Sequence, residues 1–137
     1  GNTYDLFEIV KWQEDENHCV TAVTGRFERV VTDDDCETGE YANNGQTVTF
    51  PLAADFSAMM LSSMTDADMW MIPVTDLRAW YISAYLDGTA PESGEIVFAY
   101  DVSQEDAAFD FWFITVRIAL NDAGEVAYME YEYVPWG

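Results

Sequence analysis

Near its C-terminal end the chain alternates apolar and polar residues with the two-residue period of half-buried β-strands. The two runs are FWFITVRIAL and EVAYMEYEYV, and they flank the turn-like segment NDAG within residues 111–134. If Leu120 faces Glu125, the apolar positions of both strands fall on one face. The pattern therefore predicts a hairpin over 111–134 in which Val116 lies beside Met129.

A second hairpin is predicted over residues 4–31. Its strands are YDLFEIVKW and CVTAVTGRFERVV, joined by the polar segment EDENH. Gly25 interrupts the second strand and is expected to mark a bulge. Two further strands are predicted from short β-branched and aromatic runs, QTVTF at 46–50 and EIVFAYDV at 95–102.

Two segments between these strands show helical spacing instead. In residues 55–64, Phe56, Met59 and Met60 recur at i, i+3 and i+4, and a second such pattern runs over about 76–86. Two helices are expected, although the aromatic residues of the second segment also suit a strand. The predicted fold class is α+β, with an antiparallel β-sheet and both helices covering one face. An all-β barrel or sandwich is the alternative.

The size and composition indicate one domain over residues 1–137. The chain has 137 residues, half of them hydrophobic, which is enough for a single packed core. It contains no uninterrupted apolar run of about 18 residues, so no membrane-spanning segment is expected.

The net charge of the chain limits the kinds of macromolecule that we expect it to bind. Twenty-six acidic residues against five basic ones give a net charge of −21. Such a surface repels nucleic acid and attracts basic proteins. We therefore expect no nucleic-acid partner and, if a macromolecule is bound, a basic protein. The same composition also fits adaptation to high salt or simple compositional bias, so the charge alone does not identify a function.

The two cysteines give evidence about the cellular compartment in which the protein is found. An even number of cysteines in a small domain favours a disulfide, here Cys19–Cys36, and an oxidising environment. The chain begins with Gly1 and not with methionine, which suggests that a leader has been removed. Both features favour an extracellular or cell-envelope protein, for example a lipoprotein, and a cytoplasmic protein with free thiols is the alternative.

One acidic segment, VTDDDCETGE, is the densest group of chemically versatile side chains. Its carboxylates are oxygen ligands of the type that calcium prefers, but their spacing does not match an EF-hand loop. We interpret the segment as a solvated acidic loop that binds no specific metal. It is nevertheless the best candidate binding site, and its acidic residues are Asp33, Asp34, Asp35, Glu37 and Glu40.

No catalytic constellation is evident. His18 adjoins Cys19, but neighbours along a strand point to opposite faces, so the two do not form a dyad there. Glycine-rich phosphate loops and serine elbows are absent from the sequence. Asp101 and Asp110 have apolar neighbours that could adapt one of them to acid–base work, although aspartates at strand ends are ordinary turn formers. The sequence therefore names no catalytic residue and no cofactor.

These observations favour a small exported or surface-anchored acidic domain with a binding role and no intrinsic catalysis. One alternative is an acidic inhibitor of a basic partner, either an immunity-type protein or a mimic of DNA. The other is a small-molecule enzyme or carrier with a pocket between helices and sheet.

Overall fold

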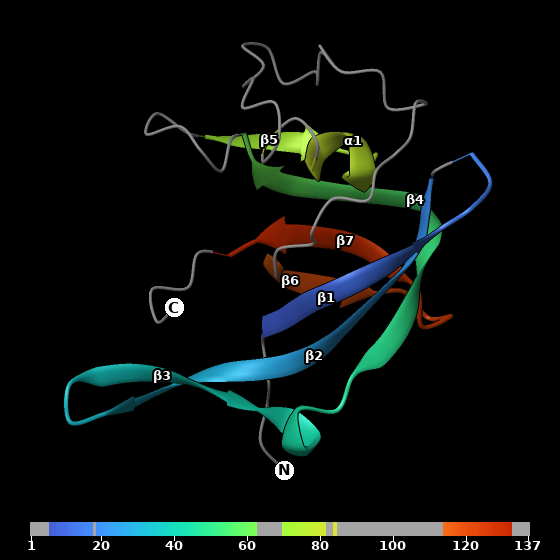
Figure 1. Cartoon of the computed structure of the whole chain (residues 1–137). Coiled ribbons are helices and arrows are strands. Elements are labelled where there is room, and N and C mark those ends of the chain that lie inside the picture. Colours follow the sequence, from blue (N-terminus) through green and yellow to red (C-terminus); the bar gives the residue numbers. More distant parts are fainter. Residues whose placement is uncertain (1–5, 18, 63–69, 82–83, 85–113, 133–137) are drawn as a thin grey trace.

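In the computed structural model of the chain, the described residues include seven β-strands that form one mixed sheet (Figure 1). The structure describes residues 6–17, 19–62, 70–81, 84 and 114–132. Within these ranges the elements are β1 (Leu6–Glu14), β2 (Val20–Asp33), β3 (Cys36–Tyr41), the 3-10 turn η1 (Ala42–Gly45), β4 (Val48–Leu61), β5 (Met71–Val74), the short helix α1 (Leu77–Tyr81), β6 (Ile114–Leu120) and β7 (Val126–Tyr131).

Five of the strands close into a ring. The sheet order β2–β1–β6–β7–β4 is completed by a further pairing between β4 and β2, so each of these strands has two neighbours. All pairings in the ring are antiparallel except β4 with β7. The five-stranded Greek-key barrel called the OB-fold has the same strand order and directions. β3 continues outward from β2, and β5 is added to the far end of β4 (Figure 1).

A bulge in β4 allows the two halves of this strand to pair with different neighbours in the sheet. Its first residues pair with β2 and its last residues pair with both β5 and β7. In the ladder with β7, Leu52 lies opposite Val126 and Ser57 opposite Tyr128, so residues 53–56 face a single residue of β7. Extra residues of this kind bend a strand away from its partner. The bend allows β4 to leave β2 and still close the ring.

The core fills the ring and continues beneath α1. Phe7, Phe27 and Phe50 meet inside the ring, with ring centroids 4.9–6.0 Å apart. On α1, Trp80 and Tyr81 are completely buried. The indole Nε1 of Trp80 donates a hydrogen bond of 2.7 Å to the carbonyl of Leu61, which satisfies its only polar atom.

Gly25 is required by close packing between β1 and β2. A Cβ atom at this position would lie 2.2 Å from the carbonyl oxygen of Glu8 and 2.8 Å from the ring of Phe7. The ladder is irregular here, as the sequence suggested, but the extra residue belongs to β1, between Ile9 and Lys11. The glycine therefore lets the two strands approach at the irregularity.

The predicted α+β class is wrong. Residues 55–61 continue β4, and the described part of the chain has no pair of helices covering a sheet face. Phe56, Ala58 and Met60 point inward with the two-residue period of a strand. The helical spacing of the larger side chains concealed this alternation because Ala58 is small. The described architecture is closer to the all-β alternative.

Within the described residues, the second predicted helix is represented by the short α1, inside the expected range 76–86. Several other predictions concern residues outside those that the structure describes. They are the rest of that helix, the strand at 95–102, His18, Asp101, Asp110 and the ends of the 111–134 hairpin.

Both predicted hairpins form, as β1–β2 within 4–31 and β6–β7 within 111–134. In the second hairpin the register differs from the expected one, because Val116 pairs with Tyr131 and Met129 pairs with Ile118. The core face is nevertheless the predicted one, since Val116 and Met129 are fully buried. The ladder is irregular beside the turn, between Ala119 and Leu120. The register therefore cannot be obtained by counting residues outward from the turn.

Candidate functional site

The most exposed described feature is a two-stranded arm, residues 28–41, which extends beyond the ring (Figure 1). It consists of the end of β2 and all of β3. The strands are joined by a two-residue turn, Asp34 and Asp35, whose φ angles are +50° and +66°. Positive φ at both turn positions matches the right-handed twist of a tight hairpin, and aspartate tolerates this conformation better than most residues.

The arm carries all five residues of the predicted acidic site. Asp33 lies at the end of β2, Asp34 and Asp35 form the turn, and Glu37 and Glu40 lie on β3, all of them exposed. Including Glu28, residues 28–41 contain six acids and one arginine. That arginine, Arg29, forms an exposed ion pair of 2.8 Å with Glu40 across the two strands.

This arrangement spreads the carboxylates along the arm. Glu37 and Glu40 are three positions apart on a strand and so point to opposite faces. Among the residues that the structure describes, no group of three or more histidine, cysteine or acidic residues is placed to hold a metal ion.

A polar cluster that the sequence did not reveal fixes the base of the arm to β1. The carboxylate of Glu8 accepts a hydrogen bond of 2.8 Å from Arg26 Nε, and its two oxygens share the single Tyr41 hydroxyl donor at 3.2–3.3 Å. The Arg26 guanidinium also lies 4.4 Å from the centre of the Tyr41 ring. The hydrogen bond to Glu8 raises the pKa of Arg26, and burial together with the Glu8 charge raises the pKa of Tyr41.

Glu28 is the more deeply buried of the two buried acids in this region, the other being Glu8. Its side chain is on the same face of β2 as Arg26, two residues away, and only 2% of the residue is exposed. Burial raises the pKa of the Glu28 carboxyl, and the nearby Glu8 charge adds to the rise, while Arg26 opposes it. Glu28 directly follows Phe27, which packs against the core, and so points to the opposite face of β2, where nothing in the local sequence indicates burial.

The arm also exposes apolar surface on the face that holds Glu37. Val30 is 43% exposed and Tyr41 is 37% exposed. Val30 lies opposite Gly39, which has no side chain to cover it. The arm therefore combines strong negative charge with an accessible apolar patch.

The predicted disulfide is not formed. Cys19 and Cys36 are both free and exposed. Cys19 precedes β2 and Cys36 follows the turn after it, so the fourteen extended residues of β2 separate them. The charge of Asp15, with smaller contributions from burial, Asp76 and Glu14, raises the pKa of the Cys19 thiol.

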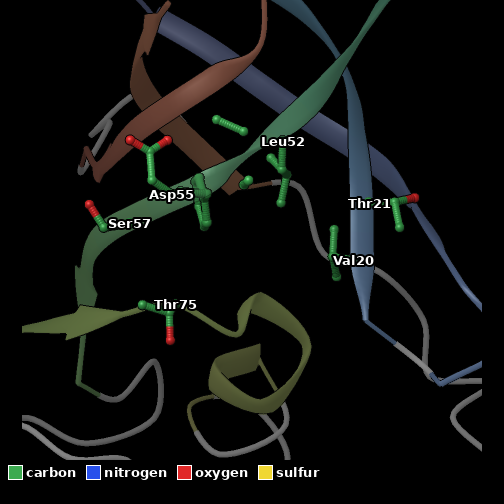
Figure 2. Close-up of a pocket in the computed structure, with 9 residues that line it drawn as sticks. Val20, Thr21, Leu52, Asp55, Ser57 and Thr75 are labelled. Atoms are coloured by element: carbon green, nitrogen blue, oxygen red, sulfur yellow. The ribbon is translucent and has the colours of Figure 1, made fainter.

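A cleft of about 620 Å³ lies between β2 and β4, where the bulge of β4 separates the two strands (Figure 2). Thr75, just before α1, closes one side of it. The lining contains one carboxylate, Asp55, and the adjoining cavity of about 120 Å³ contains Asp76. Asp76 accepts a hydrogen bond from the Ala79 N–H. The described lining thus does not bring two carboxylates together for acid–base chemistry.

No helix among the described residues is long and apolar enough to cross a membrane. Comparison of the chain with protein-family models, with curated proteins and with solved structures gave no match.

Proposed function

We propose that this chain is a non-catalytic binding domain whose acidic arm contacts a basic protein. The observation that supports the proposal best is the arm itself. It extends from the ring, carries six acids against one arginine, and exposes Val30 and Tyr41 beside those charges. Charge of one sign increases the rate of association with an oppositely charged partner, and exposed apolar side chains contribute affinity at the contact.

The partner is proposed to be a protein and not a nucleic acid. OB-folds often bind oligonucleotides, but strand order alone carries no function. Nucleic-acid binding needs lysine and arginine side chains that neutralise phosphates, whereas this chain has a net charge of −21.

The free cysteines favour a second candidate, an acidic inhibitor of a basic protein inside the cell. Exposed thiols fit a reducing compartment, and the absent disulfide no longer supports export. An exported or surface-anchored binding domain and a cytoplasmic inhibitor would use the same acidic arm, so one experiment addresses both.

The proposal is tested with a charge-neutralised arm. Five substitutions, Asp33→Asn, Asp34→Asn, Asp35→Asn, Glu37→Gln and Glu40→Gln, preserve size and remove five charges. Binding of an octalysine peptide at low salt would be measured by calorimetry. We expect the affinity to fall by about tenfold or more, since several exposed ion pairs of modest individual strength are lost together.

The control removes five charges elsewhere on the described surface. Its substitutions are Glu16→Gln, Asp55→Asn, Asp122→Asn, Glu125→Gln and Glu130→Gln. If both variants lose affinity equally, the peptide responds to net charge alone and the arm is not a binding site. Failure of the unchanged protein to bind octalysine would also contradict the proposal.

A further inference from the structure

In the part of the chain that the structure describes, the outer edge of the arm is an open β-sheet edge. β3 is the last strand in the sheet order, and among the described residues it pairs with β2 alone. An open edge presents a row of backbone N–H and C=O groups that can pair with another strand. Natural proteins usually obstruct such edges, and the acidic residues of β3 discourage pairing with neutral or acidic chains.

The register identifies which backbone groups are available. Asp33 pairs with Cys36 across the two-residue turn, so these two residues exchange their hydrogen bonds. Hydrogen-bonded and non-hydrogen-bonded pairs alternate along an antiparallel ladder. The backbone groups of Glu37, Gly39 and Tyr41 therefore point away from β2, toward the open edge.

Side chains at the same positions favour a particular occupant. Glu37, Gly39 and Tyr41 lie on one face, with Gly39 between the acid and the aromatic ring. Because Gly39 leaves Val30 uncovered, a large apolar side chain on an added strand can extend across the glycine and contact Val30. A lysine or arginine two residues away on that strand would face Glu37.

The charge also disfavours a second copy of this chain as the occupant. Pairing two β3 edges would bring together two arms that each carry six acids and one arginine. Like charges facing each other across a sheet are destabilising. A basic segment instead gains from the five exposed acids along the arm.

We propose that the open edge of β3 binds an extended, lysine- or arginine-rich segment of another protein as an added β-strand, with a large apolar residue of that segment over Gly39. This inference rests on the proposed function and specifies how the arm contacts its partner. Backbone hydrogen bonds would supply affinity, and the alternating side chains would supply selectivity.

The test uses the full chain and a blocked peptide, KTKTFTKTK, in which phenylalanine and the lysines share one face of a strand. Two derivatives carry N-methyl groups on alternate residues, one on the odd positions and one on the even positions. N–H groups alternate sides along a strand, so only one derivative loses the donors that face β3. We expect that derivative to bind at least about tenfold more weakly than the other.

A matched pair of protein variants tests the same backbone contacts by changing β3 instead of the peptide. Gly39→Pro removes an outward N–H and places a ring on the edge, whereas Gly39→Ala keeps the N–H. We expect Gly39→Pro to weaken peptide binding by about tenfold or more and Gly39→Ala to weaken it much less. Amide spectra would establish, through the Thr38 signal, that each variant keeps the arm. In the complex of the unchanged protein they would show protection of the Glu37, Gly39 and Tyr41 amides.

The outcomes separate this inference from the proposed function. If the peptide binds and neutralising the arm abolishes binding, but N-methylation and Gly39→Pro have no effect, the arm binds by charge alone and strand addition is wrong. A further peptide has threonine in place of the phenylalanine, and if it binds as tightly as KTKTFTKTK, the contact over Gly39 is wrong. Dimerisation of the free chain that is lost in Gly39→Pro would identify a second copy as the occupant and overturn the inference.

Discussion

At the scale of single residues, Glu28 is an acidic side chain in an environment that disfavours its charge. A carboxylate loses solvation when it is buried, and Glu28 is 2% exposed with the charge of Glu8 nearby. Arg26 offsets part of this cost but is already hydrogen-bonded to Glu8. The folded protein therefore favours the protonated form of Glu28 more than the unfolded chain does.

This difference predicts a pH-dependent effect of Glu28→Gln. The folded-state pKa of Glu28 is raised above its ordinary value of 4.5. Its contribution to stability is therefore fully present below that value and is lost as the pH rises through the folded pKa. Relative to the unchanged protein, Glu28→Gln should gain stability as the pH rises from about 4 to 7, as measured by urea unfolding at several pH values.

The exposed Glu37→Gln provides the control, because it removes one charge from the same arm without removing a buried carboxylate. A gain for Glu37→Gln with the same pH profile would show that net charge, not burial of Glu28, causes the effect. A constant difference between Glu28→Gln and the unchanged protein at every pH would also contradict the prediction.

At the scale of elements, the turn of the arm contains residues that are only partly suited to its backbone conformation. Asp34 and Asp35 both adopt positive φ, which aspartate tolerates but asparagine and glycine prefer. Their carboxylates also lie between those of Asp33 and Glu37. The turn is therefore expected to be less stable than an ideal hairpin turn.

Replacing Asp34–Asp35 by Asn–Gly should stabilise the arm by about 1 kcal/mol, since it relieves backbone strain and removes adjacent like charges. The measurement is amide exchange at Thr38, whose N–H is expected to bond inward to Val31. Asp34→Asn with Asp35→Asn is the charge-matched control, and it should give a smaller gain because asparagine tolerates positive φ less well than glycine. Equal protection in both variants would assign the effect to charge alone.

At the scale of the whole molecule, self-repulsion is the dominant electrostatic feature. A net charge of −21 on 137 residues destabilises the folded state, and any salt should relieve this by screening. The melting temperature should rise smoothly with sodium chloride, by about 5 °C or more between low salt and half-molar salt.

Calcium distinguishes screening from specific binding. A ligand bound only by the folded state stabilises it at low concentration. At about a millimolar, the upper end of extracellular calcium affinities, calcium should raise the melting temperature no more than sodium chloride of equal ionic strength. A larger calcium shift that disappears in Asp33→Asn with Asp35→Asn would show that the arm is a metal site after all.

The local sequence determined the features that depend on near neighbours. Alternating β-branched and aromatic residues predicted both hairpins, and the core face of the second one was correct because a period of two leaves only two possible faces. The composition predicts the sign of the charge on any partner, and the acidic residues that the sequence offers as the candidate site lie together on the arm. These properties need no knowledge of distant contacts.

Tertiary structure decided the rest. Residues 55–61 have no strong preference for a strand, but β5 and β7 supply hydrogen-bond partners on both sides, and this pairing outweighs the helical spacing of Phe56, Met59 and Met60. Ring closure depends on the pairing of β2 with β4. The cysteines remain free because the length of β2 separates them. The Glu8–Arg26–Tyr41 cluster forms because three strands meet there. Each of these features joins residues that are far apart in the chain. Its contribution to the free energy of folding therefore arises only when the fold brings those residues together.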